Sequence, residues 1–417
     1  MAFLTEAANR GSIPTGPYQI ENSLKCEPDN GERLDTNTIF TNYDSTKKFT
    51  FSGWFKRTEI GVQSILEAQV NTGVSVNLII QSDDQLQAYI EGSGDADQLK
   101  TTRKFRDTSA WYHIMWIVDT TLSTASDRLK LYINGVRETS FTTETQPTQN
   151  RDVPLQQRHY LFGYDGSNNG FRGYVSDFYF LDGIAADATD FGEFDEDSGI
   201  WKPIEYTGNF GTEGYFLNFS DAANLGDDQS SNNQGSFIEY GISAADQATD
   251  TPTNNFCTLN PIFESNGTNP ELTISEGATR AVNAASAYKS ATSTIGVSTG
   301  KWYWEVNVTD RNTITTIGVT MPYYWDAGNI PFSGTVYYGQ TGQRHNNSVA
   351  GGGQDSFGNG YTDGDIISFA LDMDATTPTL AVRKNNSLVT GNNATGNLMY
   401  GLSLTGSGGT FLPPKED

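Results

Sequence analysis

The chain has 417 residues, enough for two or three domains with cores of their own, so no disulfide or metal is required to stabilise the fold. Its 26 Lys and Arg against 50 Asp and Glu give a formal net charge of −24, which argues against nucleic acid and membrane surfaces as partners. Its 43 Gly and 12% aromatic residues, with only 18% charged residues, favour short strands joined by tight turns.

The two cysteines, Cys26 and Cys257, lie far apart in the sequence and form no disulfide framework. We therefore expect free thiols in a chain assembled in a reducing cytoplasm. The first ten residues lack the charged and apolar regions of a signal peptide. The sequence contains no apolar run of about 18 residues, the length that a membrane-spanning helix needs.

The first half of the chain begins with a small, polar segment, residues 1–20, which we predict to be an extended docking arm. Strand-like alternation follows, and the predicted strands are 49–55, 74–80, 86–90, 111–118, 128–133, 160–164 and 173–181. Asn134-Gly135 after one of them is a strong hairpin signal. Strands spaced by roughly ten residues indicate a β-sandwich or barrel.

The second half shows a change of character and then a return of strand patterns. After a predicted strand at 215–219, the polar, turn-rich segment 221–255 is typical of a linker. Further strands are predicted at 302–308, 314–319, 366–371 and 379–382. The sequence thus predicts an all-β fold: an arm, a sandwich over 21–220, a linker over 221–255 and a second sandwich over 256–417.

Three motifs of the first sandwich resemble the laminin G/concanavalin A-like jelly roll. They are FTFSGWFKR, the Trp111-Tyr-His stretch before RLKLYINGV, and GYVSDFYFLDGIAADATDF. In that family the second motif places two neighbouring strands of one sheet. The third is a closing strand, matched here by Gly173, Asp177 and Asp182. The resemblance covers about residues 20–220 and implies a jelly-roll fold.

The second sandwich resembles a SPRY domain. Its GKWYWEV, IGV, YTDGDI and KNN segments follow the order of that family, although Asn386 replaces the family's usual Gly and the closing Asn-Phe-Gly element is missing. The two domains together, joined through Asp195–Pro203, Gly211–Phe219 and Asp250–Pro261, resemble a family of virion-associated proteins of marine bacteriophages. That resemblance implies a structural role on the surface of the particle.

One acidic motif invites an enzyme hypothesis, because laminarinase-type glucanases share the jelly roll and use a Glu-x-Asp-x-(x)-Glu strand. The nearest match here begins at Glu193 and Asp195, but Asp197 or Ser198 stands where the acid/base Glu belongs. Flanking glycines also favour a loop. A glycan hydrolase is therefore disfavoured, and we expect no catalytic residues.

Metal sites have little support in the sequence. His113, His159 and His345 show no metal-ligand spacing, which argues against zinc. Ca²⁺ is the one ion to consider, since Asp227 and Asp228 place hard oxygen ligands on a predicted loop, as do Asp187 and Asp190. Solvated turns explain such pairs equally well, and no other cofactor is expected.

Aromatic residues in predicted loops give a binding hypothesis, because sugar rings stack on exposed aromatic faces. The candidate binding residues lie in one Gly-rich region and are Tyr323, Tyr324, Trp325, Tyr337, Tyr338 and Arg344. The same side chains could instead pack on a neighbouring subunit.

We interpret the chain as a non-catalytic virion surface protein, a capsid decoration, head fibre or tail fibre subunit. It would dock on other virion proteins by its N-terminal region, form a homo-oligomer such as a trimer, and present its sandwiches outward, where a host surface glycan could bind. The alternative is a dedicated receptor-binding or carbohydrate-binding adhesin.

Overall fold

The computed structural model describes residues 18–28, 31–36, 38–71, 73–92, 94–164, 169–232, 234–262, 272–283, 291–311, 315–320, 335–345, 354–376 and 378–389. The chain divides into two compact units. The first comprises 1–263, 272–283 and 291–295, and the second 264–271, 284–290 and 296–417. Over the described residues the regular structure is antiparallel strands and short 3₁₀ helices, which confirms the all-β prediction, and no helix there is long and apolar enough to cross a membrane.

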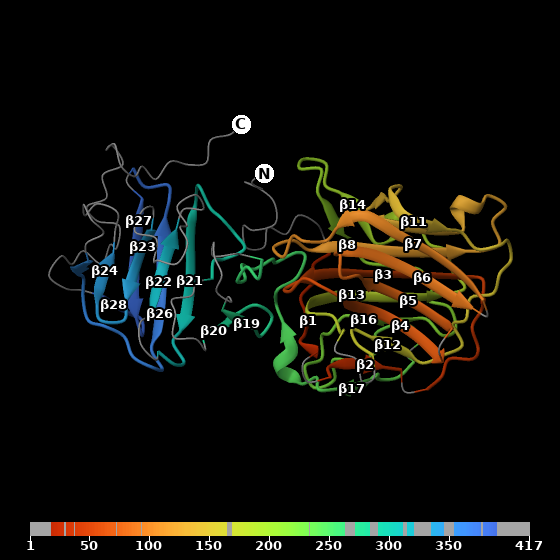
Figure 1. Ribbon diagram of the computed structural model, residues 1–417, viewed down its shortest axis with the longest axis horizontal. Coiled ribbons are helices and arrows are strands. Elements are labelled where there is room, and N and C mark those ends of the chain that lie inside the picture. The colour runs from red at the N-terminus through yellow and green to blue at the C-terminus, as the bar shows by residue number, and fades with distance from the viewer. Residues whose placement is uncertain are drawn as a thin grey trace. The chain divides into compact units, whose positions relative to one another are not determined.

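Two antiparallel eight-stranded sheets form the body of the first unit (Figure 1). The β3 sheet has the order β10-β9-β8-β3-β13-β1-β18, with β16 paired to β13, and the β5 sheet has the order β11-β7-β6-β5-β4-β12-β2-β17. The strands of the β3 sheet are β1 (Ser23–Cys26), β3 (Lys48–Arg57), β8 (Tyr112–Asp119), β9 (Leu129–Ile133), β10 (Val136–Arg137), β13 (Gly173–Asp182), β16 (Tyr215–Leu217) and β18 (Gln247–Ala248). Those of the β5 sheet are β2 (Arg33–Asp35), β4 (Gln63–Asn71), β5 (Val74–Ile80), β6 (Gln85–Gly92), β7 (Asp95–Lys104), β11 (Phe141–Thr145), β12 (His159–Leu161) and β17 (Ile238–Tyr240).

The core between these sheets follows from the period of two in their strands. Alternate residues of β3, such as Phe49 and Phe51, are fully buried and face residues such as Val76 and Leu78 of β5 in one apolar cluster. Strands β8 and β9 continue the β3 sheet, and β9 ends at the predicted hairpin with β10. There Asn134 (φ 49°) and Gly135 (φ 73°) supply the two left-handed positions of that turn.

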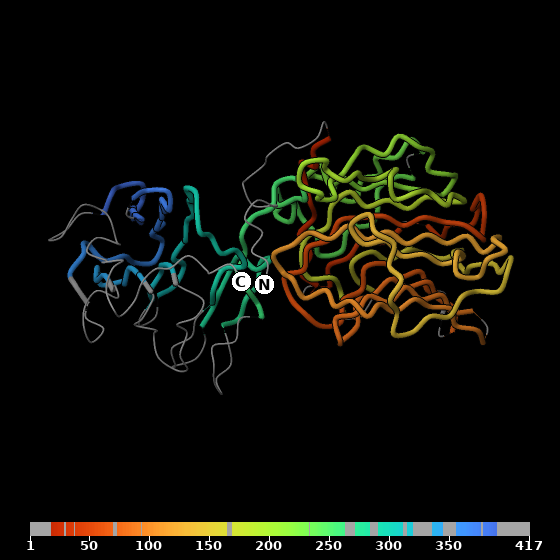
Figure 2. The backbone as a smooth tube through the Cα atoms, turned by 90° about the horizontal axis from the view of Figure 1, so that it is seen from above, coloured from red at the N-terminus to blue at the C-terminus, as the bar shows by residue number. Residues whose placement is uncertain are grey.

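The outward face of the β3 sheet is also covered. Trp54, Met115 and Tyr179, on three of its strands, form a second apolar cluster with Phe191 and Trp201 from the segment 183–210. That segment contains the hairpin β14 (Gly192–Phe194) and β15 (Trp201–Pro203). In Figure 2 the yellow-green part of the first unit, which includes it, lies on the side opposite the orange strands β4–β7. The β3 sheet is therefore buried on both faces.

The segment 221–255 is not a linker, contrary to the sequence prediction. It supplies β17, which pairs with β2, and β18, which pairs with β1. Asp250 at its end forms a buried ion pair with Lys56 of β3, with Nζ and Oδ2 2.7 Å apart. In the sequence the segment is typical of a linker, because its few strand residues lie among polar turns. The strands with which they pair lie about 200 residues earlier in the chain, so the pairing leaves no local signal.

The predicted arm, residues 1–20, lies mostly outside the described residues. Its last three residues pack on the first unit. The Tyr18 hydroxyl donates to Asp177 Oδ2 (2.8 Å), and the Ile20 amide donates to Thr253 Oγ1 (3.1 Å). A further hairpin of the first unit, β19 (Thr273–Ser275) with β20 (Arg280–Val282), lies beyond residue 256, where the second sandwich was expected to begin.

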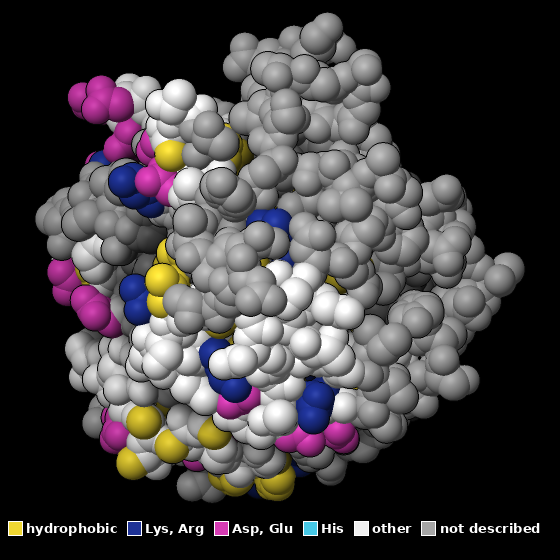
Figure 3. All heavy atoms as spheres, turned by 90° about the vertical axis from the view of Figure 1, so that its left-hand side faces the viewer, with side chains coloured by type: hydrophobic (Ala, Val, Ile, Leu, Met, Phe, Trp, Pro, Cys, Tyr) yellow, Lys and Arg dark blue, Asp and Glu magenta, His cyan; other side chains and the backbone are white. Residues whose placement is uncertain are grey.

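The second unit contains two antiparallel four-stranded sheets, β21-β26-β27-β28 and β22-β23-β24-β25. Their strands are β21 (Lys301–Asn307), β22 (Thr316–Thr320), β23 (Thr335–Gly339), β24 (Gln343–His345), β25 (Gln354–Ser356), β26 (Ile366–Asp372), β27 (Thr379–Lys384) and β28 (Ser387–Leu388). Residues of both sheets, including Tyr338 and Phe369, share one core, so the unit is a β-sandwich. On the side on which Figure 1 labels β24 and β28, acidic and basic side chains are interspersed over the described surface and hydrophobic ones form small groups (Figure 3).

Candidate functional site

The outward face of the β5 sheet carries a row of polar and aromatic side chains. Strand register places Glu67 of β4 opposite Tyr160 of β12 on one side and Asn77 of β5 on the other, and Asn77 opposite Tyr89 of β6. Tyr89 is in turn opposite Gln98 of β7. Directly opposed residues share a face of a sheet, with Cβ atoms about 5 Å apart. We call these five residues, Tyr160, Glu67, Asn77, Tyr89 and Gln98, the polar ladder.

The ladder is reachable by a ligand, because all five of its side chains are partly exposed. The residues between them along the strands, such as Val76, Leu78 and Ala88, point inward and are fully buried. The same alternation that builds the core therefore presents the ladder to solvent.

Asn77 has a hydrogen-bonding capacity that the described residues leave unused. Its Nδ2 donates to Ser75 Oγ (3.2 Å), while its Oδ1 is buried and accepts no hydrogen bond in the structure. An unsatisfied buried acceptor of this kind is costly to the folded state.

Glu67, next to Asn77, titrates in an unusual range. Partial burial raises the pKa of its carboxyl to about 7, and burial is the sole cause of the shift. The carboxyl can therefore act as a donor or an acceptor near neutral pH. Burial, and then the nearby Glu91 carboxylate, also raise the pKa of Tyr89.

The rest of this face is amide-rich, and the basic side chain of Lys100 on it is already engaged. Gln87 Nε2 donates to Gln98 Oε1 (2.6 Å), and Lys100 Nζ lies 2.7 Å from Asp83 Oδ2 in an ion pair. Amides, and a carboxyl whose pKa lies near neutrality, form hydrogen bonds with hydroxyl groups. Phenol rings stack on the apolar faces of other rings. The face is suited to a neutral, hydroxyl-rich ligand.

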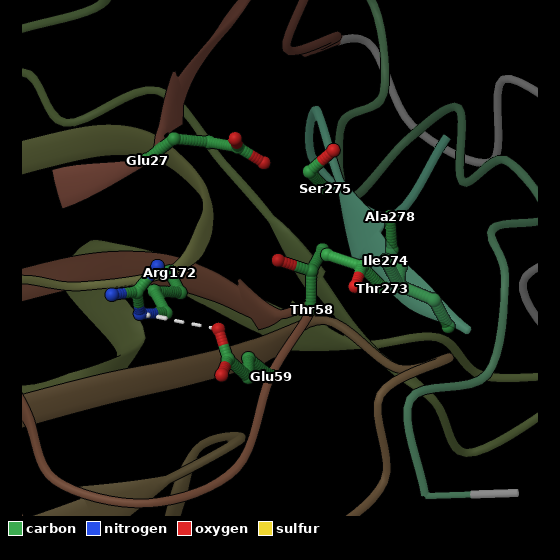
Figure 4. Close-up of a pocket in the computed structure, with 8 residues that line it drawn as sticks. All are labelled: Glu27, Thr58, Glu59, Arg172, Thr273, Ile274, Ser275 and Ala278. Carbon is green, nitrogen blue, oxygen red and sulfur yellow. Dashed lines mark ion pairs between the residues drawn. The ribbon is translucent and has the colours of Figure 1, made fainter. Parts of the chain in front are cut away.

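A separate small cavity lies beside the hairpin β19–β20 of the first unit. Its volume is about 200 Å³, and its lining residues are Glu27, Thr58, Glu59, Arg172, Thr273, Ile274, Ser275 and Ala278. Figure 4 shows Glu27 directed toward Ser275, with the ion pair of Arg172 and Glu59 on one wall. In that pair Nε and Oε2 are 3.1 Å apart. Arg172, the basic side chain of the cavity, is thus already paired with a carboxylate.

Two histidines lie in buried structural networks. His113 Nε2 is 2.8 Å from Ser52 Oγ, and its Nδ1 accepts from the Trp201 indole (3.2 Å), beneath the segment 183–210. His159 is 2.9 Å from the Tyr43 hydroxyl inside the core. Burial lowers the pKa of both imidazoles to about 3, so both are neutral. Neither reaches the polar ladder, and no group of three or more His, Cys, Asp or Glu suited to a metal occurs in the described parts of the chain.

The predicted aromatic binding residues divide into two groups. Tyr323, Tyr324 and Trp325 lie outside the described residues. Tyr337, Tyr338 and Arg344 lie on β23 and β24 and are buried, with exposed fractions of 6%, 0% and 5%. The Tyr338 ring packs against Phe357 and Tyr361. Tyr338 and Arg344 stand opposite each other and share the core-facing side of their strands, whereas Tyr337, the neighbour of Tyr338, is buried on the other side.

The predicted calcium ligands have protein partners. Asp228 is buried and accepts from the amides of Phe216, Ser230 and Gln234, with the Ser230 hydroxyl as a fourth donor. Asp227 accepts from Gln229 Nε2 (2.6 Å). Asp228 thus organises its loop through hydrogen bonds, which occupy the oxygens that a cation would need. Asp187 and Asp190 form a capping box on a 3₁₀ turn at Ala188–Asp190.

The acidic motif of the hydrolase hypothesis lies on the exposed hairpin β14–β15. Lys202 Nζ pairs with Glu193 Oε1 (3.2 Å) and with Asp195 Oδ2 (3.4 Å). Asp195 also accepts from Ser198, as expected of a turn. Both carboxylates are therefore paired with one lysine on a two-stranded hairpin.

The polar ladder was not identified from the sequence. Its signal was the polar or tyrosine residue at alternate positions in LEAQ, VSVN and QLQAYIEG, which indicates that one face is polar. The sequence does not show which polar residues stand opposite each other, because that depends on strand register.

Residues 29–187 match the model of the concanavalin A-like lectin/glucanases superfamily, in its laminin G form. The first unit therefore contains a laminin G/concanavalin A-like domain, as the sequence motifs predicted. No curated protein sequence matches the chain.

Several solved structures are similar to this chain at low identity. A putative carbohydrate binding protein from Bacteroides ovatus is 14% identical, with a TM-score of 0.37, and the match covers 56% of this chain and 61% of that one, less than two thirds of its length. The mouse laminin alpha1 chain domains LG4-5 are 11% identical, with 92% and 81% covered and a TM-score of 0.32. A SAP-like pentraxin from Limulus polyphemus is 12% identical, with 41% and 80% covered and a TM-score of 0.31.

Proposed function

We propose that this protein is a non-catalytic glycan-binding protein that holds neutral sugars on the polar ladder of its first unit. The observation that carries the proposal is the partly exposed row of five polar side chains across five neighbouring strands, in which Asn77 lies between Glu67 and Tyr89. Sugar hydroxyls would form hydrogen bonds with the exposed polar groups of this row, and the tyrosine rings would pack against the apolar face of a pyranose.

The choice of a neutral sugar rests on charge. The chain carries a formal net charge of −24, and Glu67 and Glu91 lie on the ladder face. Anionic glycans would be repelled there, whereas neutral hydroxyls form hydrogen bonds without that cost.

The non-catalytic assignment rests on the carboxyl groups of this face. Hydrolysis of a glycosidic bond requires two carboxyl groups about 5–10 Å apart on opposite sides of the sugar. The residues directly opposite Glu67 are Tyr160 and Asn77, so no second carboxyl group is its cross-strand neighbour.

The proposed setting is the surface of a bacteriophage particle, as a capsid decoration, head fibre or tail fibre subunit. The support is the sequence resemblance of the two domains in this order, a laminin G-like domain followed by a SPRY-like one. In this setting the chain would dock on other virion proteins through its N-terminal region and assemble as a homo-oligomer such as a trimer. A dedicated host-receptor adhesin would use the same ladder.

Binding to an array of neutral and acidic glycans tests the ladder. We expect Tyr89→Ala and Asn77→Ala each to weaken binding of a neutral glycan by about tenfold, since one lost stacking or hydrogen-bond contact is worth ~1.5 kcal/mol. The matched control is Tyr303→Ala, which removes a 59% exposed tyrosine of the second unit. Equal binding by all three variants, or binding of acidic glycans only, would refute the assignment.

The particle setting needs a separate test. Electron microscopy of intact particles labelled with an antibody against residues 256–417 should show signal at the head or at the tail. Signal over the head would indicate a decoration or head fibre, whereas signal at the tail would indicate receptor binding. Absence of the protein from purified particles would contradict the setting without bearing on the glycan site.

A further inference from the structure

Lys56 of β3 is a lysine with no solvent exposure in the first unit. Its Nζ lies 2.7 Å from Asp250 Oδ2, 2.7 Å from Asn255 Oδ1 and 2.6 Å from the carbonyl oxygen of Phe256. The side chain of Lys56 is 0% exposed and that of Asp250 is 6% exposed. Three acceptors thus surround the three donors of one buried amine.

The partners of Lys56 are themselves held in place. The Trp111 indole donates to Asp250 Oδ1 (3.0 Å), and Asn255 Nδ2 donates to the carbonyl oxygen of Ser109 (2.8 Å). The Tyr174 ring centroid lies 5.8 Å from Nζ. The amine, the carboxyl and the side-chain amide therefore meet in a small aromatic-lined site that excludes water.

This arrangement holds the components of an acyl transfer. An amine nucleophile contacts the oxygen of a primary amide, and a carboxyl group contacts the amine. We propose that Lys56 and Asn255 form an intramolecular isopeptide bond, with Asp250 as the general acid and base for the reaction.

The reaction is balanced without any co-reactant. Lys56 first passes one proton to Asp250, which leaves a neutral amine and a neutral carboxylic acid. The Nζ lone pair attacks Cγ of Asn255, so that the Nζ–Cγ bond forms and the Cγ–Nδ2 bond breaks. Asp250 gives its proton to the departing Nδ2 and takes one from Nζ. One ammonia leaves, and Asp250 carries one proton before and after the transfer.

Burial moves both groups of this pair toward the neutral forms that the reaction needs. Burial lowers the pKa of the Lys56 amine, and burial raises the pKa of the Asp250 carboxyl, in each case against the attraction of the other group. A neutral amine is the nucleophilic form of lysine, and a carboxylic acid can polarise an amide carbonyl.

The bond would join residues 199 positions apart in the sequence. It would connect the central strand β3 to the end of the segment 221–255, which otherwise belongs to the first unit through the short strands β17 and β18. As with a disulfide that closes a long loop, such a cross-link restricts the unfolded chain.

The test is the intact mass of the denatured, full-length protein. We expect a mass lower than that of the sequence by one ammonia, and a digest that contains one peptide pair joined through Lys56 and Asn255. Cyclisation of an asparagine to a succinimide loses the same mass, but its digest contains no joined pair, so that outcome would overturn the proposal.

Two variants define the roles of the residues. Asn255→Ala removes the electrophile and keeps the Lys56–Asp250 ion pair, so its mass should equal that of its own sequence. Asp250→Asn removes the proton carrier, and we expect no ammonia loss; cross-linking in this variant would overturn the role of Asp250. Circular dichroism checks that each variant is folded.

Wild-type protein that is folded and still has the full sequence mass after prolonged incubation would overturn the proposed bond. This result does not depend on any variant.

Discussion

The two sheets of the first unit use their outward faces in opposite ways. On the β3 sheet the outward residues Ser52, Trp54 and Lys56 are buried under the segment 183–210 and the end of the segment 221–255. On the β5 sheet the outward residues Glu67, Asn77 and Tyr89 stay partly exposed. Both sheets have the same alternation, so the difference lies in the connections that cover one face and leave the other open. The covered face carries stability, and the open face is free for a ligand.

The largest effect should come from removing the cover of the β3 sheet. Trp201→Ala deletes an indole that is 6% exposed, that donates to His113 and that packs in the second apolar cluster. We expect a loss of about 3–5 kcal/mol in the free energy of unfolding of the first unit, as for other buried tryptophans. Urea denaturation measures it.

The counterpart on the open face is Tyr89→Ala, which should cost less than about 1 kcal/mol because the tyrosine is only partly buried. Similar losses for the two variants would show that the two faces do not differ as described.

A smaller effect should follow from crowding Trp201 without removing it. Gly135 has φ +73°, and a Cβ there would lie 2.2 Å from Trp201 Cε3. Gly135→Ala should therefore destabilise the first unit by about 1–3 kcal/mol through overpacking added to backbone strain.

Gly31 provides a matched control for this substitution, since it has the same φ of +73° and no atom within 4 Å of an added Cβ. Gly31→Ala should show the backbone cost alone. Equal thermal shifts for the two alanine variants would mean that contact with Trp201 is unimportant.

The smallest effect concerns the open face and depends on pH. The pKa of Glu67 is raised from 4.5 to about 7, so the folded state holds this proton more tightly than the unfolded state does. Its contribution to stability is complete below about pH 4.5 and is lost as the pH rises to about 7.

Glu67→Gln should consequently gain stability relative to wild type between pH 4.5 and 8, by about 1 kcal/mol once solvent screening of the half-exposed group is allowed for. Thermal unfolding of both proteins over this range gives the difference, in which the contributions of other titrating groups such as Asp177 cancel. A difference independent of pH would contradict the burial of Glu67.

Much of the fold could be predicted from the sequence, because strand patterns are local. The predicted strand 111–118 corresponds to β8, and 173–181 corresponds to β13. Asn134-Gly135 marks the turn between β9 and β10 through the positive φ of both residues. In the second unit Asn385 (φ 48°) and Asn386 (φ 65°) adopt the same conformation, so the asparagine in place of the usual glycine still makes the turn.

Contacts between residues far apart in the chain could not be predicted from the sequence. The segment 221–255 has few apolar residues, and its place in the first unit depends on contacts such as Lys56 with Asp250, 194 positions apart. The polar ladder depends likewise on the register of five strands. Tyr338 is a residue type common in binding sites, but it lies on β23 between two neighbouring strands, and its side chain points into the core.

The points where the described chain enters and leaves the body of the first unit are bonded to each other. Thr253 Oγ1 accepts from the Ile20 amide (3.1 Å) and donates to the Ile20 carbonyl oxygen (3.0 Å), and the Ser23 hydroxyl donates to the carbonyl oxygen of Asp250 (2.6 Å). Opposite forces applied at Ile20 and Asn255 would therefore load this short connection in shear. The strands that carry the polar ladder lie outside that path and would bear little of the load.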